Sequence, residues 1–286
     1  MTDLIAVTGA TGELGRRVAR LLADRNVAQR LVVREAKRAP DIPGVEIAVA
    51  DYGTPDALKK AFSGAKTLFF VSAHEAPGRQ ATHRAVVEAA KAAGVERVVY
   101  TSFMGASPNA TFTYARDHAH TEMAIRDSGM KLTALRNALY ADVAPHLVGD
   151  HGIIRGPAGN GAVAWVARED VARLAAAVLV DPSHINQIYD VSGSEPIDLH
   201  ATAQILSEVS GREITYVPET LEEARASRAG NEPWLIEGWV SSYAAIATGE
   251  CSVTSHTIEH VTGKRPWSFA EFLNAEPDSW KHLVRH

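Results

Sequence analysis

The chain has 286 residues, of which 46% are hydrophobic and 22% charged, and its formal net charge is −5. The length allows one large α/β domain carrying a smaller lobe, or two modest domains, and the composition falls in the ordinary globular range. It contains no Lys/Arg-rich run and no apolar run near the ~20 residues that span a bilayer, which argues against nucleic-acid and membrane partners. A lone cysteine, Cys251, and a start without a signal-peptide pattern lead us to expect a cytoplasmic protein.

Short apolar runs alternate with helical patterns through the first half of the chain. The expected strands are Leu4–Thr8, Arg30–Val33, Val45–Val49, Thr67–Val71, Arg97–Thr101 and Leu132–Leu135. The expected helices between them are Glu13–Asp24, Pro55–Phe62, Arg79–Ala93 and Thr113–Ser128. Unbroken apolar strands joined by helices predict a doubly wound parallel sheet, a Rossmann fold, covered on both faces.

The alternation loosens after Arg136, where glycines crowd the stretch 149–161. We expect strands at Gly152–Arg155, Val163–Val166, Gln187–Val191 and Glu213–Val217, and helices at Arg168–Val180, Leu199–Ser210, Glu219–Arg228 and Pro233–Ala247. We therefore predict a Rossmann domain of residues 1–136 plus about 162–192. Residues of about 137–161 plus 193–286 would form a smaller C-terminal α/β lobe that binds the substrate.

The strongest motif is Gly9-Ala-Thr-Gly12-Glu-Leu-Gly15, which follows the first strand and opens the first helix. Gly9 permits the tight turn, Gly12 lets backbone N–H groups approach a pyrophosphate, and Gly15 allows close packing of helix and strand. The helix N-terminus then offers free amides to the phosphates. This placement predicts a dinucleotide site.

The end of the second strand predicts which dinucleotide is bound. Cations there accommodate the 2′-phosphate of NADP, whereas a carboxylate binds the 2′-hydroxyl of NAD. The sequence from Arg34 through Lys37 to Arg38 places three cations in this region, and Glu35 is the one residue that argues for NAD. We expect NADP(H), with an exposed basic loop as the alternative.

Several motifs together resemble a known family. They are Gly9–Gly15, Val33-Arg34, Ala50-Asp51-Tyr52-Gly53, Ala89-Ala-Lys-Ala-Ala-Gly94-Val, Tyr100-Thr-Ser102, Leu135-Arg136-Asn137-Ala-Leu-Tyr140 and Ala203-Gln-Ile-Leu-Ser-Glu-Val-Ser-Gly211. The chain resembles the atypical short-chain dehydrogenase/reductases of the NmrA-like group. Within that group it is most similar to type-2 NAD(P)H:quinone oxidoreductases and triphenylmethane-dye reductases.

The resemblance implies a set of cofactor contacts. Arg34, with Lys37 nearby, would face the 2′-phosphate, Asp51 would lie near the adenine, and Arg168 would either touch the cofactor or be a structural arginine at a helix start. The pyrophosphate would be bound by Gly9, Ala10, Thr11, Gly12, Glu13 and Leu14. The cofactor would be bordered further along by Phe70, Val71 and Ser72, and its nicotinamide side by Asn137, Ala138, Leu139 and Tyr140.

The catalytic residues are less well defined than the cofactor contacts. Many short-chain reductases pair Ser with Tyr-x-x-x-Lys, and here Ser102 is followed by Tyr114 with His118 in the place of the lysine. A histidine guarantees no permanent cation, which weakens an assignment as carbonyl reductase or epimerase. Ser102, Tyr114 and His118 are therefore catalytic candidates, with strand-end hydrogen bonding and helix packing as alternatives for the first two.

Two other patterns carry little weight. His118, His120 and Glu122 do not share one helix face, so we expect no metal site. Cys251 has no base partner visible in the sequence, so we expect no nucleophilic thiol.

The leading hypothesis is an NADPH-dependent reductase of a quinone or a similar electron-poor, dye-like aromatic acceptor, with the cofactor supplying the chemistry. An NmrA-like redox sensor without turnover and a sugar-nucleotide epimerase or dehydratase are the alternatives. A homodimer is expected from general frequencies alone.

Overall fold

The computed structural model describes residues 3–284, which form two compact units. The first unit comprises the residues up to Pro108, Asp117–Arg136 and Val171–Tyr189, and the second comprises Asn109–Arg116, Asn137–Asp170 and the residues from Asp190 onward. Residues 109–116, 162–170 and 190–192, which were predicted to lie in the Rossmann domain, thus belong to the second unit.

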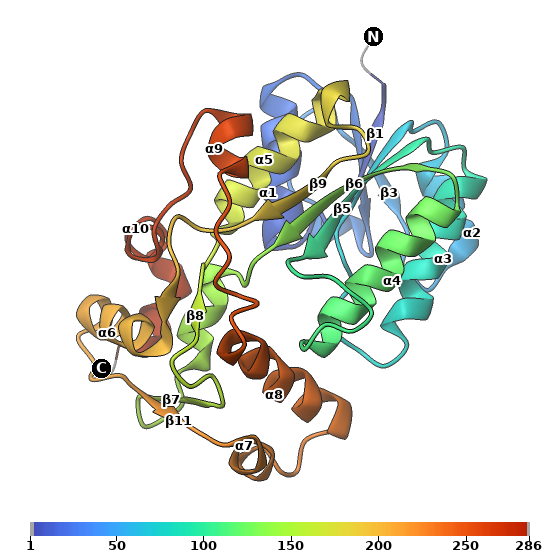
Figure 1. Cartoon of the computed structure of the whole chain (residues 1–286). Coiled ribbons are helices and arrows are strands. Elements are labelled where there is room, and N and C mark those ends of the chain that lie inside the picture. The colour runs from blue at the N-terminus through green and yellow to red at the C-terminus, as the bar shows by residue number, and fades with distance from the viewer. Residues whose placement is uncertain (1–2, 285–286) are drawn as a thin grey trace. The chain divides into compact units, whose positions relative to one another are not determined.

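A seven-stranded parallel sheet is the centre of the first unit (Figure 1). Its order is β3-β2-β1-β4-β5-β6-β9. The strands are β1 Ile5–Thr8, β2 Gln29–Val33, β3 Glu46–Val49, β4 Thr67–Phe70, β5 Arg97–Phe103, β6 Lys131–Asn137 and β9 Ile188–Val191. In register, Ile5 of β1 pairs with Gln29 on one side and Thr67 on the other. The strand order therefore reverses between β1 and β4, the point at which such sheets bind ligands beyond their carboxyl ends.

Helices cover both faces of this sheet (Figure 1). They are α1 Glu13–Asp24, α2 Pro55–Phe62, α3 Arg79–Ala92, α4 Thr113–Asp127 and α5 Arg168–Val180. Helices α1 and α5 share one face, where Arg25, directly after α1, donates to the carbonyl of Ala176 at 2.9 Å. Helices α2, α3 and α4 share the other face. Burial of apolar side chains such as Leu58 and Val86 under this layer stabilises the fold by about 1.5–3 kcal/mol each.

The second unit contains two small sheets and five helices of its own among the described residues. Parallel strands β7 Ile153–Gly156 and β11 Thr215–Pro218 form one sheet, and antiparallel β8 Ala162–Val163 and β10 Ile197–Asp198 form the other. The helices are α6 Leu199–Ser210, α7 Leu221–Ser227, α8 Pro233–Ala247, α9 Thr257–Thr262 and α10 Phe269–Ala275. Capping boxes start α7 at Thr220 and α10 at Ser268, so both helix starts are set locally by sequence.

The structure differs from the predicted elements mainly in the second unit. The strand expected at Val163–Val166 ends at Val163, because the next residues bond to other segments: Ala164 N–H donates to Cys251 and Val166 N–H donates to Leu139. Helices α9 and α10 and the 3-10 segment Ala141–Leu147 were not predicted.

Candidate functional site

The glycine loop after β1 is built as a close-packed turn. Gly9 has φ 64°, and a Cβ there would lie 2.8 Å from Cβ of Val71, the residue after β4. A Cβ on Gly15 would lie 2.3 Å from the Gly9 oxygen and 2.9 Å from the Ala10 nitrogen. Both positions therefore exclude a side chain, which brings the loop against the first turn of α1 at the point of strand-order reversal.

The N-terminus of α1 retains free backbone donors. Its N-cap is Gly12, which has no side chain to accept from the first turn, so the helix dipole and amides face the loop. The first-turn carboxylate of Glu13 is paired with Arg16 and Arg17. These pairings offset a negative charge that would oppose an anionic ligand, so the loop suits a pyrophosphate.

The cations after β2 are not equivalent. Lys37 Nζ lies 3.3 Å from a carboxylate oxygen of Glu35, and Arg38 lies 3.8 Å from the other. Arg34 is exposed and, within residues 3–284, has no hydrogen bond or ion pair. Glu35 thus holds the two outer cations and leaves the Arg34 guanidinium available for a phosphate.

The ends of β3 and β4 supply the next predicted contacts. Asp51 is exposed and Oδ1 accepts from Gly53 N–H at 2.9 Å, which closes a turn after β3. Phe70 is fully buried, whereas Val71 and Ser72 are half-buried. The Ser72 N–H donates to Thr101 Oγ1 at 2.8 Å, so this segment is anchored to β5. Only Val71 and Ser72 of this segment thus expose side chains at the sheet edge.

Ser102, one of the catalytic candidates, is only 3% exposed, and its hydroxyl donates to Glu122 Oε1 at 2.7 Å. The carboxylate of Glu122 also accepts from Arg136 at 2.9 and 2.8 Å and from Arg126 at 3.3 Å. The Ser102 hydroxyl is therefore one of the partners of a buried, paired carboxylate, a structural task that the sequence alone did not reveal.

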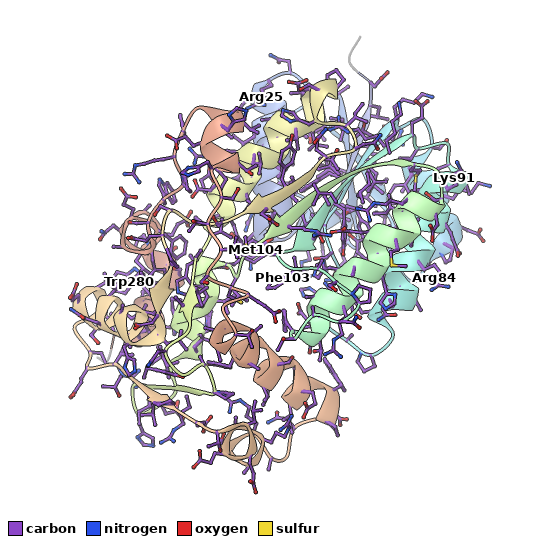
Figure 2. All side chains as sticks on the ribbon, viewed as in Figure 1. Arg25, Arg84, Lys91, Phe103, Met104 and Trp280 are labelled. Atoms are coloured by element: carbon purple, nitrogen blue, oxygen red, sulfur yellow. The ribbon has the colours of Figure 1, made fainter. Side chains whose placement is uncertain are left out.

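His118 lies in a second buried network. Arg79 Nη2 donates to His118 Nε2 at 3.1 Å, which leaves the ring proton on Nδ1, 2.9 Å from the Tyr100 hydroxyl. Burial first, and then the charge of Arg79, lower the pKa of His118 well below its ordinary value. Phe103, the last residue of β5 (labelled in Figure 2), packs beside the His118 ring with centroids 6.2 Å apart. His118 is therefore neutral at physiological pH and cannot supply a lysine-like charge.

His83 extends this network on α3. Its Nε2 accepts from Ala73 N–H at 2.9 Å, so the ring proton is on Nδ1, 2.7 Å from Thr121 Oγ1. Burial, followed by the charge of Arg79, lowers the pKa of His83 to about 3. The Arg79–His118–Tyr100–His83 network thus joins α3, α4 and β5 through neutral histidines and one cation.

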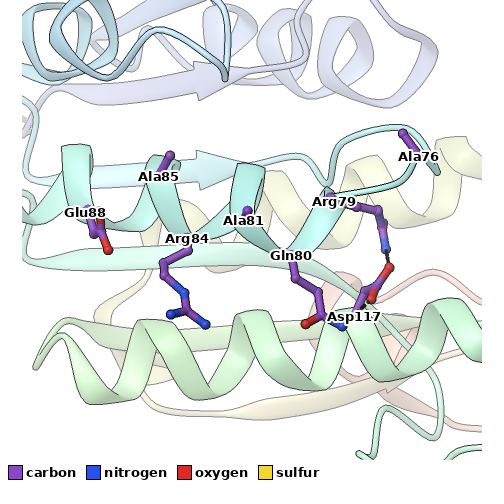
Figure 3. Close-up of a pocket in the computed structure, with 9 residues that line it drawn as sticks. Ala76, Arg79, Gln80, Ala81, Arg84, Ala85, Glu88 and Asp117 are labelled. Carbon is purple, nitrogen blue, oxygen red and sulfur yellow. Dashed lines mark hydrogen bonds and ion pairs between the residues drawn. The ribbon is translucent and has the colours of Figure 1, made fainter.

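A groove of about 590 Å³ runs over the outer face of α3 and α4 beside this network. Figure 3 shows Arg79 and Gln80 of α3 directed toward Asp117 of α4, with Arg79 Nη1 at 3.6 Å and Gln80 Nε2 at 2.7 Å. None of the described residues that line it belongs to the predicted cofactor site. The groove is a feature of the helix layer rather than of the sheet edge.

Tyr114 belongs to the second unit and packs tightly on α8. A Cβ built on Gly238 would lie 2.3 Å from the Tyr114 hydroxyl oxygen, and the Tyr114 ring meets Phe112 edge-on at 5.3 Å. Ser102 is hydrogen-bonded to Glu122 and His118 to Arg79, whereas Tyr114 packs against the backbone at Gly238.

The segment after β6 carries the clearest sign of a ligand in the second unit. Asn137 is 2% exposed, and its Nδ2 donates to the Tyr140 hydroxyl at 3.1 Å. Its Oδ1 is buried and has no partner in residues 3–284. Arg168 lies over the Tyr140 ring, 3.8 Å from its centroid, and its Nε donates to Asp142 at 2.8 and 3.0 Å. An unpartnered buried amide oxygen at a strand end can accept from a bound water or from a ligand, and here it lies at the carboxyl end of a parallel strand, where ligands bind.

The sequence provides no reason to expect a metal site, a membrane span or a nucleophilic thiol. Within residues 3–284, no group of three His, Cys, Asp or Glu side chains is placed to hold a metal ion, and no helix has the length and apolar character that a membrane span requires. Cys251 is buried, and burial raises the pKa of its thiol to about 12.

Residues 9–182 match the model of the NAD(P)H-binding family, a range that begins at the first glycine of the phosphate loop. The chain belongs to the NAD(P)H-binding family. This membership and the relatives below confirm the resemblance found in the sequence.

Quinone oxidoreductase 2 of Escherichia coli (strain K12) is 35% identical over 95% of the chain and 98% of its own length. Among solved structures of the family, an Escherichia coli NADPH-dependent quinone oxidoreductase complexed with NADPH superposes with a TM-score of 0.85, at 30% identity, covering 98% of this chain and 99% of the other. Triphenylmethane reductase of Citrobacter sp. complexed with NADP(H) gives 0.81 at 34% identity, over 95% and 99% of the two chains.

Some family-site features had no counterpart in the sequence prediction. The missed contacts join residues that are distant along the chain: Arg79 donates to His118 across 39 residues, Ser102 to Glu122 across 20, and Arg168 to Asp142 across 26. The sequence did offer a signal for Asp142. Its carboxylate follows Tyr140 by two residues and can pair with the cation of Arg168, and both of those residues are predicted cofactor contacts.

Proposed function

We propose that the protein is an NADPH-dependent reductase that transfers a hydride to a quinone or a similar electron-poor aromatic acceptor. The observation that carries the proposal is the phosphate loop with its uncapped helix start, joined to an unpaired Arg34 at the end of β2. The names of the relatives, an NADPH-dependent quinone oxidoreductase and a triphenylmethane reductase, support this class of acceptor.

In this proposal each end of the cofactor has its own residues. The amides of Gly9 to Leu14 bind the pyrophosphate, Arg34 binds the 2′-phosphate, and Asp51 accepts from the adenine amine. Lys37 contributes long-range charge, because Glu35 already holds it. Val71 and Ser72 border the cofactor, and Asn137 to Tyr140 border the nicotinamide, whose carboxamide would satisfy the Asn137 oxygen.

The bound nicotinamide supplies the hydride, and the protein supplies position and electrostatics. An acceptor that is already electrophilic needs little activation, which agrees with the lack of a Tyr-x-x-x-Lys motif. Holding donor and acceptor in contact accounts for most of the rate enhancement.

The test is NADPH oxidation, followed by absorbance, with and without a panel of quinones and cationic triarylmethane dyes, and with NADH in parallel. Acceptor-dependent turnover that prefers NADPH is the expected result. Tight cofactor binding with no turnover across the panel would overturn the proposal in favour of a redox sensor. Binding of a nucleotide sugar would favour an epimerase. We also propose a cytoplasmic location and a homodimer, which fractionation and sedimentation analysis test directly.

A further inference from the structure

Tyr140 is held by a cation and by an amide, both in the second unit. The Arg168 guanidinium carbon lies 3.8 Å from the ring centroid, and Asn137 Nδ2 donates to the hydroxyl at 3.1 Å. A guanidinium over an aromatic face is attracted to the ring, and it stabilises negative charge on the phenol more strongly than the neutral form. A donor to the phenolic oxygen acts in the same direction.

Backbone pairing fixes this arrangement. Val166 N–H donates to the Leu139 carbonyl at 3.0 Å, and Ala141 N–H donates to the Val166 carbonyl at 2.9 Å. Residue 140 is thereby aligned with residue 166, two positions before Arg168 at the start of α5. Asp142 then accepts from Arg168 Nε with both carboxylate oxygens, which fixes the guanidinium above the ring.

The Tyr140 hydroxyl also lies where a ligand is expected. It is hydrogen-bonded to the same Asn137 amide whose buried oxygen lacks a protein partner. Asn137 is the last residue of β6, and parallel sheets bind ligands beyond the carboxyl ends of their strands. The cation-supported tyrosine is therefore one hydrogen bond from the position that a ligand must complete.

We propose that Tyr140 is the proton donor for quinone reduction, that Arg168 is the cation that supports it, and that Asp142 is a positioning residue acting through Arg168. This inference rests on the proposed function. It assigns to Tyr140 and Arg168 the tyrosine–cation partnership that His118 cannot provide at Tyr114.

A hydride, two electrons and one proton, passes from NADPH to the quinone, giving NADP⁺ and a hydroquinone monoanion. The O–H bond of Tyr140 breaks as its proton passes to the anionic oxygen, giving the neutral hydroquinone, and the phenolate takes a proton from water. A cationic triarylmethane dye differs, because hydride addition at its central carbon gives a neutral product without any proton.

This difference between acceptors gives the experiment its control. Tyr140→Phe is compared with wild type using 1,4-naphthoquinone, a triarylmethane dye, and NADPH affinity measured by fluorescence titration. Tyr189→Phe is the matched control, since that tyrosine hydroxyl is hydrogen-bonded to His184 at 2.7 Å, outside the proposed site. General acid catalysis contributes 10²–10⁴-fold, so we expect quinone kcat to fall roughly 100-fold. Dye kcat should fall much less than quinone kcat, and any rise in the Kd for NADPH should be too small to account for the loss with quinone.

Asp142→Asn tests the positioning role with the same readouts. We expect a smaller loss of quinone kcat than in Tyr140→Phe and an unchanged rate with dye. The ratio of the quinone rate to the dye rate would therefore fall, whereas a general loss of folding would lower both rates and leave that ratio unchanged. Equal losses with both acceptors, weakened NADPH binding that explains the loss, or an unchanged quinone rate in Tyr140→Phe would each overturn the proposal. If the dye is not turned over, the quinone rate and the Kd for NADPH decide. A wild-type protein inactive with every quinone would instead refute the proposed function itself.

Discussion

Replacing Gly15 with alanine tests whether the phosphate loop depends on contact between the helix and the loop backbone. The added Cβ would lie 2.3 Å from the Gly9 oxygen, 2.5 Å from its carbonyl carbon and 2.9 Å from the Ala10 nitrogen. Ordinary carbon contacts are near 3.5 Å, so the loop must move by roughly 1 Å. All three contacts are with backbone atoms, so no side chain can rotate away.

The expected cost of Gly15→Ala has two parts. Overpacking costs about 1–3 kcal/mol, and the better helix propensity of alanine returns about 1 kcal/mol, so the unfolding free energy should fall by up to about 2 kcal/mol. The displaced amides should also lose a charge-assisted hydrogen bond to the pyrophosphate. One such bond is worth about 1.5–3 kcal/mol, or roughly 10- to 100-fold in Kd for NADPH.

Gly12→Ala is the matched variant in the same loop. Its Cβ would meet only the Gly9 oxygen, at 3.4 Å, and the backbone at Gly12, φ −94° and ψ 173°, suits any residue. Its free energy of unfolding should therefore stay close to wild type, while NADPH binding weakens if the pyrophosphate approaches Gly12 closely. Urea unfolding measures the first quantity, and fluorescence titration measures the affinity for NADPH. A Gly15→Ala protein with wild-type stability and wild-type affinity would refute the reasoning.

Three further predictions follow from the geometry of the first unit. Arg34→Ser should weaken NADPH binding roughly 10- to 100-fold without affecting NADH, and Lys37→Ser should change it far less; titration with both cofactors checks this. Glu122→Gln should lower the unfolding free energy by about 3–5 kcal/mol, because it breaks a buried ion pair, whereas Ser102→Ala removes only one hydrogen bond, about 1.5–3 kcal/mol; equal costs in urea unfolding would contradict this. His83 is neutral in the folded protein, where its pKa is about 3, and protonates below pH 6.5 in the unfolded chain. It should therefore lower the free energy of unfolding by about 1.4 kcal/mol per pH unit as the pH falls from 6.5 toward 3. A His83→Asn variant whose unfolding free energy depends on pH with the same slope as wild type would show that His83 does not titrate in this way.

Much of the first unit could be predicted because its signals are local. Inner strands such as β1 (IAVT) and β4 (TLFF) are short and mainly apolar, and the motif from Gly9 to Gly15 carries its own turn and packing requirements. The family resemblance followed from the same motifs and is confirmed. The contact roles assigned to individual residues stay predictions until a cofactor-bound measurement tests them.

The side-chain networks could not be predicted, because their partners are distant in sequence. Ser102 donates to Glu122 on α4, and Glu122 in turn accepts from Arg136 on β6. Arg168 reaches Tyr140 through a bridge between residues 140 and 166. A spacing of three or four residues indicates a shared helix face, but it does not reveal that His118 is buried under Arg79. In contrast, the start of α10 could have been predicted from the sequence, because Ser268 and Glu271 have the spacing of a capping box.

The interleaving of the two units along the chain has a consequence for how such proteins diversify. The polypeptide passes from one unit to the other at residues 108/109, 116/117, 136/137, 170/171 and 189/190. No single recombination breakpoint can therefore exchange one unit for a homologous one. A new acceptor preference must therefore accumulate through point substitutions and loop changes within both units. This gradual route is consistent with the two relatives, which each share about a third of their residues with this chain but are named as a quinone reductase and a dye reductase.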